Sequence, residues 1–230
     1  MATKHQGLTV VTGASAGIGL ELAKMCARQG FDLILVAGEP AIEASAQAIR
    51  DDTGVAVQSV QADLGTPEGV EQVLSAIGDR PVEALLLDTG CGMGRAFLDH
   101  EWADVHRAID TNLLGTMRLI HRLGAGMRER GFGRTLGAEL QGCGITVSCL
   151  LPRSPATDWL EHAGVDASRP VVGGKVDPEF VSRATLGVMT PREGLTGWMT
   201  NVRAAFASVA PAAVMARLTW AQARPRSARK

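Results

Sequence analysis

Short apolar runs recur at regular intervals through the first half of the chain, and each has the length of a β-strand. They are LTVV (8–11), DLILVA (32–37), VAVQSV (55–60) and VEALLL (82–87). The second run shows no alternation with polar residues, which is typical of a strand buried on both faces of a parallel sheet. GITVSCLL (144–151) predicts one more buried strand in the second half.

Helical periodicity fills the intervals between these strands. We expect helices from the turn after the first strand to about Gly30, from about Pro40 to Arg50, and from Thr66, which with Pro67 suits a helix N-cap and first turn. Their predicted inward faces are Ile18, Leu22, Met25 and Cys26 in the first helix, and Val70, Val73, Leu74 and Ile77 in the third.

The rest of the chain adds three more predicted helices. A long one spans roughly His100 to Arg130, and one opens at Asp177 and Pro178. Trp198, Val202 and Phe206 mark the third, which Pro211 interrupts. The inward face predicted for the long helix is Trp102, Val105, Ile109, Leu113, Met117, Ile120 and Leu123.

Strands that alternate with helices at this spacing predict right-handed βαβ units. The fold class is therefore α/β, with a doubly wound, Rossmann-like parallel sheet covered on both faces. No internal repeat or linker divides the sequence, so we expect a single domain over 1–230. The tail at about 222–230 is expected to be disordered.

Composition adds mainly exclusions. The 230 residues are 46% hydrophobic and 20% charged, with a net charge of −1, which argues against nucleic acid as a partner. No apolar run approaches the roughly 18 residues of a membrane span, and the N-terminus is too polar for a secretory signal, so we expect a cytoplasmic protein. The four cysteines form no CxxC pair and the five histidines no HExxH motif, so we expect no metal site.

A glycine-rich stretch, TGASAGIG (12–19), follows the first predicted strand and opens the first helix. Glycines at 13, 17 and 19 allow a tight turn and a close approach of backbone to a pyrophosphate, while a helix N-terminus offers N–H groups to the anion. A glycine-rich string alone could be just a tight turn, but its position between strand and helix at the start of an α/β chain predicts a dinucleotide site.

The TGxxxGxG spacing resembles that of the short-chain dehydrogenase/reductase family. Further matches follow in order along almost the whole chain: ADL (62–64), DTGCG (88–92), IDTN (109–112) and LPRSPATDW (151–159). The resemblance implies NAD or NADP as cofactor and hydride transfer between nicotinamide and a small alcohol or ketone. It also implies a set of cofactor-binding residues: Thr12, Gly13, Ser15, Gly17, Ile18, Gly19, Gly38, Glu39, Asp63, Leu64, Thr89, Gly90, Pro152 and Thr157.

Several of these positions have alternative interpretations. Asp63 would accept from the adenine amino group, or it is a turn carboxylate, and Thr157 would contact the nicotinamide end, or it is a surface loop residue. Glu39 follows the second strand. There the family has either an acidic residue, which bonds the adenosine 2′-hydroxyl, or a basic residue, which pairs with a 2′-phosphate. The carboxylate favours NAD over NADP, unless Glu39 is only a solvated residue before Pro40.

Two further segments that the family places beside the cofactor depart from the family pattern. The family's Asn-Asn-Ala-Gly reads Leu87-Asp88-Thr89-Gly90, and its Pro-Gly reads Pro152-Arg153. Asp88 can still accept a hydroxyl proton from a ribose. Arg153 would either bind a phosphate or obstruct the nicotinamide.

The catalytic residues depart further. The family uses a Tyr-x-x-x-Lys pair with a serine and an asparagine, because a phenol with a pKa near 10 needs a nearby cation to act near neutral pH. Asn112 matches the asparagine, but the chain contains no tyrosine. Only the nine residues GRTLGAELQ (133–141) stand where the fifth strand and the tyrosine helix should lie, although a strand with its crossover helix takes about 30 residues. We interpret this as a deletion and expect impaired catalysis.

The deletion has structural consequences. The seventh strand also looks short at 194–197, and strand 144–151 could pair with strand 82–87 to cover its open edge.

The remaining candidate acid/base groups are Lys175, His162 and Cys91, but loop or surface positions explain each more simply. Three interpretations stay open: an oxidoreductase or its truncated gene model, a dinucleotide-binding sensor without turnover, and a structural subunit. A homo-oligomer could form through 198–220.

Overall fold

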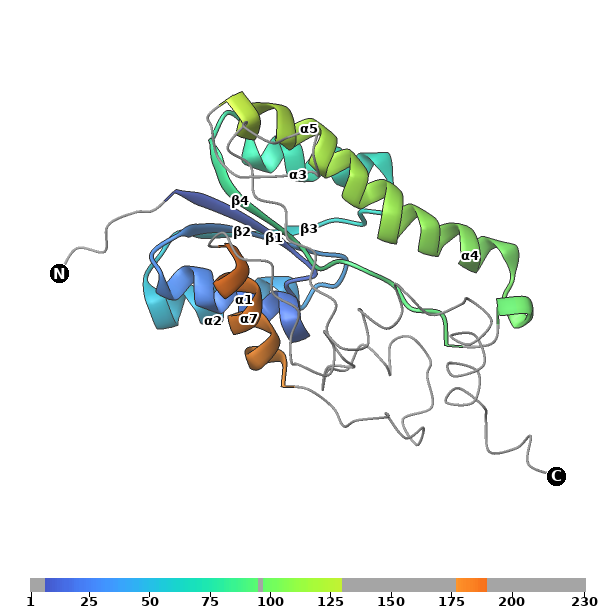
Figure 1. The fold of residues 1–230 in the computed structure, drawn as a ribbon, viewed down its shortest axis with the longest axis horizontal. Helices are drawn as coiled ribbons and strands as arrows, with labels where there is room; N and C mark the ends of the chain where they lie inside the picture. The colour runs from blue at the N-terminus through green and yellow to red at the C-terminus, as the bar shows by residue number, and fades with distance from the viewer. Residues whose placement is uncertain (1–6, 95–96, 130–176, 190–230) are drawn as a thin grey trace, which may run out of the picture.

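The structure is a computed structural model that describes residues 7–94, 97–129 and 177–189. Figure 1 shows a twisted sheet with helices on both faces. The strands are β1 (Leu8–Thr12), β2 (Asp32–Ala37), β3 (Val57–Gln61) and β4 (Val82–Leu87). The helices are α1 (Gly17–Arg28), α2 (Ile42–Thr53), α3 (Pro67–Ile77), η1 (Phe97–Asp99), α4 (Trp102–Ile109), η2 (Asp110–Gly115), α5 (Thr116–Glu129) and α7 (Pro178–Met189).

The described strands form one parallel sheet in the order β3-β2-β1-β4. β1 therefore lies between β2 and β4, with Val10 opposite Ile34 on one side and Leu85 on the other. Because all three pairings are parallel, the carboxyl ends of the four strands lie at one edge of the sheet. The predicted α/β, Rossmann-like fold class is confirmed.

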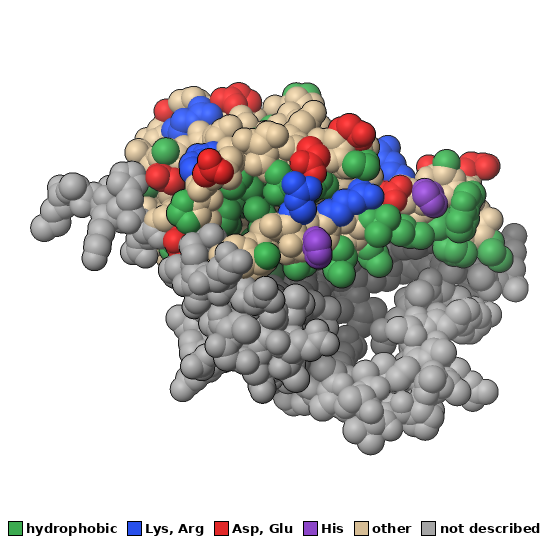
Figure 2. Space-filling model, turned by 90° about the horizontal axis from the view of Figure 1, so that it is seen from above, with side chains coloured by type: hydrophobic (Ala, Val, Ile, Leu, Met, Phe, Trp, Pro, Cys, Tyr) green, Lys and Arg blue, Asp and Glu red, His purple; other side chains and the backbone are tan. Residues whose placement is uncertain are grey.

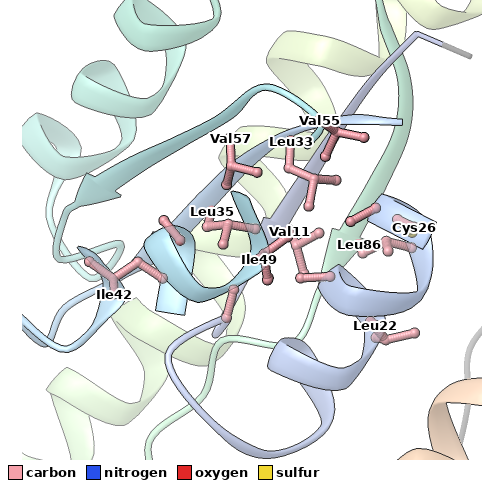
Figure 3. Packing of buried hydrophobic residues seen from close by; sticks show 14 of the residues in the cluster. Val11, Leu22, Cys26, Leu33, Leu35, Ile42, Ile49, Val55, Val57 and Leu86 are labelled. Atoms are coloured by element: carbon pink, nitrogen blue, oxygen red, sulfur yellow. The ribbon is translucent and has the colours of Figure 1, made fainter. Parts of the chain in front are cut away.

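Each strand serves two hydrophobic cores, because successive side chains point to opposite faces of the sheet. Val11, Leu33 and Leu35 pack toward α1 and α2 (Figure 3), whereas Val10 and Ile34 pack toward α3 and α5. These five side chains are at most 1% exposed. Burial on both faces explains the apolar runs without polar alternation that predicted the strands.

The helix ends follow local signals. Thr66 caps α3 by accepting from the Gly69 N–H at 3.0 Å, as predicted, and Asp177 accepts from the Glu179 N–H at 3.0 Å at the start of α7. The second helix runs from Ile42 to Thr53 rather than from about Pro40 to Arg50. It continues to Gly54, whose left-handed φ of 73° ends the helix.

The helix predicted from His100 to Arg130 is continuous, but its predicted inward face is wrong in part. Trp102, Ile109, Leu113 and Met117 are 69%, 40%, 58% and 62% exposed. Val105 is buried as predicted, and the other buried positions are Ala108, Thr111, Gly115 and Leu119. Figure 2 shows hydrophobic side chains along this side of the surface.

The cause is a close contact in the middle of this helix. A Cβ atom at Gly115 would lie 2.2 Å from the Leu64 carbonyl oxygen, so only glycine allows the helix to approach that loop. The π-helical turn η2 (Asp110–Gly115) also shifts the face by inserting an extra residue. Backbone proximity, and not hydrophobicity, therefore decides which face of α4 and α5 turns inward.

Several sequence-based expectations lie outside the described residues. They include the interval 133–141, the strand 144–151, Pro152, Arg153, Thr157, His162, Lys175, the segments 194–197 and 198–220, and the tail 222–230. Within the described ranges, no helix is long and apolar enough to cross a membrane.

Candidate dinucleotide-binding site

The glycine-rich turn between β1 and α1 is tight for steric reasons. Gly13 and Gly17 have φ angles of 66° and 62°, in the left-handed region that favours glycine. A Cβ atom at Gly13 would lie 2.6 Å from the Asp88 carbonyl oxygen, and one at Gly19 would lie 2.3 Å from the Gly13 carbonyl oxygen. The predicted glycines are thus required by close backbone contacts.

The first turn of α1 offers backbone donors to an anion. Its N-cap residue is Ala16, which has no side-chain oxygen, and no acidic residue lies in the first turn. Within the described part of the chain, no acceptor is found for the N–H groups of Gly17 and Ile18. Such unpaired N–H groups and the helix dipole favour a phosphate at this position.

The carboxyl end of β2 brings Glu39 to the glycine-rich turn. The Ser15 hydroxyl donates to the Glu39 carboxylate at 3.1 Å, and the Ser45 hydroxyl donates to the Ser15 carbonyl oxygen at 3.1 Å. Ser15 and Glu39 are 24 residues apart, and both were predicted to bind cofactor. The structure therefore places a carboxylate beside the turn, next to Gly38.

The loop after β3 holds Asp63 and Leu64 in different environments. The Asp63 carboxylate accepts from the Gly65 N–H at 2.9 Å, so it stabilises its own turn, and the residue remains exposed. Leu64 is only 2% exposed and packs into the core near Gly115. An open surface hollow at this end of the sheet is lined by Gly38, Gln61, Ala62, Asp63, Thr66, Glu68, Gly69 and Gln72.

The end of β4 is tied to the end of β1 through one hydroxyl group. Thr12 Oγ1 accepts from the backbone N–H groups of Asp88 and Thr89, at 3.1 and 3.2 Å. The Thr89 hydroxyl is itself buried and has no hydrogen-bond partner within the described part of the chain. A buried polar atom of this kind is costly unless a ligand or water satisfies it.

Asp88, which follows β4, has a shifted pKa. Desolvation of its carboxyl group raises the pKa of Asp88 to about 6. The backbone N–H of Gly19 lowers the pKa of the same carboxyl group and so opposes the shift. From the sequence, Asp88 is only a tolerated departure from the family pattern, and the approach of its backbone to Gly13 is not predicted.

Asn112 lies in η2 and holds the loop that follows β4. Its Oδ1 atom accepts from the Cys91 N–H at 2.7 Å, and its Nδ2 atom donates to the Cys91 carbonyl oxygen at 2.9 Å. A Cβ atom at the neighbouring Gly90 would lie 3.4 Å from Asn112 Oδ1. The structure thus fixes the backbone of this loop through Asn112, and the catalytic role of Asn112 stays a prediction.

These contacts bring most of the predicted residues together at the carboxyl edge of the sheet, where ligands of open α/β sheets bind. The exceptions are Pro152 and Thr157, which lie outside the described ranges. Among the described residues, no group of three or more histidines, cysteines or carboxylates could hold a metal ion.

Comparison with known proteins identifies this arrangement. The family model described as short chain dehydrogenase matches residues 8–136, which is more than half of the chain. The chain belongs to the short-chain dehydrogenase family. It therefore shares its ancestry and its sheet with a family of oxidoreductases.

Individual relatives of the short-chain dehydrogenase family agree. The chain is 28% identical to the short-chain reductase protein NovJ of Streptomyces niveus, over 88% of this chain and 94% of NovJ. It is 33% identical to the 3-oxoacyl-(acyl-carrier-protein) reductase FabG of Vibrio cholerae, over 56% of this chain. That second match spans about half of the relative, 52% of its length.

Solved structures confirm the short-chain dehydrogenase fold. A short-chain dehydrogenase from Sphingobium yanoikuyae, in complex with NADPH, has a TM-score of 0.77 with this chain. The superposition covers 96% of this chain and 97% of that protein, at 24% sequence identity.

Proposed function

We propose that this chain binds NAD(P) at the carboxyl edge of the sheet. The glycine-rich turn carries the proposal, because Gly13 and Gly19 are required by close contacts and α1 presents unpaired N–H groups there. The buried and unpartnered Thr89 hydroxyl fits a ligand at the same edge. The NADPH complex of the Sphingobium yanoikuyae relative supports a cofactor of this class.

The adenosine ribose would lie between the turn and Glu39. A carboxylate there accepts a hydrogen bond from a 2′-hydroxyl and repels a 2′-phosphate, so we propose a preference for NAD over NADP. The Ser15–Glu39 hydrogen bond supports this proposal, because it holds the carboxylate beside the turn. The bound NADPH is a property of the Sphingobium yanoikuyae protein. The cofactor preference of this chain is decided by measuring its affinities for NADH and NADPH.

We further propose that turnover is strongly impaired. When bound, a nicotinamide cofactor supplies or accepts a hydride, but the family's proton transfer at the substrate oxygen depends on a tyrosine, and this chain has none. The match to NovJ runs over 251 positions, more than the 230 residues of this chain, so NovJ has residues where this chain has gaps. That length difference supports a deletion.

Two functions fit a binding protein with little turnover. One is a dinucleotide sensor, and the other is a shortened version of a reductase whose complete form acts on a small ketone or alcohol. The FabG and NovJ relatives, both named as reductases, support the second. Titration followed by an activity assay separates them from an active enzyme.

The first test is calorimetric titration of the full chain with NADH and NADPH. We expect dissociation constants in the micromolar range, which correspond to a free energy of binding on the order of −8 kcal/mol, with NADH bound more tightly than NADPH. Mixing the saturated protein with small ketones should then give no decrease in absorbance at the nicotinamide wavelength above the background rate. Measurable reduction of a ketone would contradict the proposed impairment.

A matched pair of glycine variants tests the position of the site. Gly19→Ala should weaken NADH binding at least about tenfold, because its Cβ atom would lie 2.3 Å from the Gly13 carbonyl oxygen and displace the turn. Gly124→Ala is the control, since a Cβ atom there meets nothing within 4 Å. Equal affinities for the two folded variants would place the cofactor elsewhere.

A further inference from the structure

Helix α7 packs on α1, although most of the chain separates the two helices in the sequence (Figure 1). Val181 and Ser182 of α7 are both 0% exposed, whereas Phe180 and Arg183 on either side of them are exposed. The Ser182 hydroxyl donates to the Ile18 carbonyl oxygen of α1 at 3.3 Å, across 164 residues of sequence. The contact of α7 therefore reaches the first turn of α1, which belongs to the glycine-rich turn.

The Ser182 hydroxyl links the two helices through its single hydrogen. It shares this hydrogen between the Ile18 carbonyl oxygen and the Pro178 carbonyl oxygen, the latter at 2.8 Å. The bond to Pro178 is the usual bond of a helical serine to the carbonyl oxygen four residues before it, and it lies within α7. The bond to Ile18 is the one that exists only while α7 is docked on α1.

The Ile18 carbonyl group shares its peptide unit with the Gly19 N–H. A peptide unit is planar, so a partner of the carbonyl oxygen also helps to fix the direction of the N–H, and it strengthens that N–H as a donor. The Gly19 N–H has no acceptor within α1, because the first hydrogen bond of the helix runs from the Leu20 N–H to the Ala16 carbonyl oxygen at 3.3 Å. Ser182 therefore acts on one of the N–H groups at the helix end where a phosphate would bind.

We propose that Ser182 positions the Ile18–Gly19 peptide for dinucleotide binding, so that the docking of α7 on α1 and the binding of the dinucleotide favour each other. The inference rests on the proposed dinucleotide binding, and it adds regulation of that site by a helix from the second half of the chain. The coupling is reciprocal. A bound dinucleotide stabilises the docked α7 by the same factor by which docked α7 tightens dinucleotide binding.

The test measures the affinity of ADP-ribose by calorimetry, because this probe carries the pyrophosphate and lacks the nicotinamide. Ser182→Ala should bind about threefold to tenfold more weakly than wild type, which is the effect of losing one hydrogen bond. Val181→Ala is the matched control, since it removes a buried apolar group from the neighbouring position of α7 and keeps the Ser182 hydroxyl. We expect its affinity to stay within about twofold of wild type, because α7 stays docked in the folded protein.

Two further readouts separate positioning from an effect on stability alone. The carbonyl carbon of Ile18 should change its NMR chemical shift in Ser182→Ala, where the hydrogen bond is lost, and not in Val181→Ala. ADP-ribose should slow the hydrogen exchange of the α7 amides about threefold to tenfold in wild type, and much less in Ser182→Ala.

Wild-type affinity in folded Ser182→Ala, or equal weakening in Ser182→Ala and Val181→Ala, overturns the positioning role of Ser182 and leaves dinucleotide binding intact. Absence of ADP-ribose binding to the folded wild type overturns the proposed function and this inference together. Circular dichroism establishes that each variant is folded.

Discussion

At the scale of single residues, Thr12 illustrates how one side chain can join distant parts of this chain. Its hydroxyl accepts from two backbone N–H groups that lie 76 and 77 residues further along the sequence. Thr12 itself is fully buried. Replacing it with valine would leave both N–H groups without that acceptor in a protein interior, where each such loss costs about 1–3 kcal/mol.

Thr12→Val should therefore destabilise the chain by about 2–4 kcal/mol, although valine and threonine have nearly the same shape. Chemical denaturation of the two proteins measures the difference. Thr12→Ser retains the hydroxyl and should lose much less. A larger loss in the serine variant than in the valine variant would show that the methyl group, and not the hydroxyl, makes the important contact.

Asp88 also predicts how stability depends on pH in the absence of any ligand. Its folded pKa of about 6 lies above the ordinary value of 3.8, so the folded state holds this proton more tightly than the unfolded chain does. The stabilisation from the protonated form is complete below about pH 4 and is lost as pH rises through about 6. Solvent contact of Asp88 limits the effect to about 1 kcal/mol.

Asp88→Asn should accordingly be more stable than wild type above about pH 6, and the difference should shrink as pH falls toward 4. Thermal unfolding at several pH values, compared between the two proteins, measures this. A constant difference over the whole range would indicate an effect of shape and not of charge.

At the scale of secondary-structure elements, the long helix α4–η2–α5 shows what its sequence alone does not reveal. Leu113 is 58% exposed, whereas Leu119 is fully buried against the core beside α3. We expect Leu119→Ala to cost about 2–4 kcal/mol in the free energy of unfolding. Leu113→Ala should change it by no more than about 0.5 kcal/mol. Urea denaturation of both variants checks the assignment, and a large loss for Leu113→Ala would restore the face predicted from the sequence.

The two outcomes at this scale have a common physical explanation. The strands were predictable because burial on both faces requires runs such as DLILVA, and the helix starts because Thr66 and Asp177 are ordinary capping residues. The face of α4 and α5 was not predictable, because it depends on the approach of Gly115 to the Leu64 carbonyl oxygen. A contact between segments about 50 residues apart leaves no periodic signal in the sequence.

The candidate site also has features that the sequence predicts and features that only the fold reveals. The turn at 12–19 could be found from its glycines and its place between strand and helix. The close approach of the Asp88 carbonyl oxygen to Gly13 could not, since it depends on β4 lying beside β1. Asn112 was found through the family resemblance, but its two hydrogen bonds to the Cys91 backbone required the fold.

At the scale of the whole molecule, the sheet should have a gradient of local stability. β1 and β2 are buried along almost their whole length, whereas β3 has one buried residue, Val57, with the others half-buried or exposed, and lies at one edge of the sheet formed by the described strands. Amide hydrogen exchange should therefore be slowest in β1 and β2 and faster in β3. Equal protection of the three strands would mean that they open only by global unfolding.

The strand order also has a consequence for folding during synthesis on the ribosome. β1, β2 and β3 emerge first and can pair with one another, but β1 reaches its other neighbour only after α3 and β4 have been translated. Until then the nascent chain presents one side of β1, which is buried along its whole length in the folded sheet, to solvent with its backbone groups unpaired. Slow translation of the segment before Val82 would therefore lengthen the interval in which chaperones are needed, and synonymous codon changes there could alter the yield of folded protein while leaving its sequence unchanged.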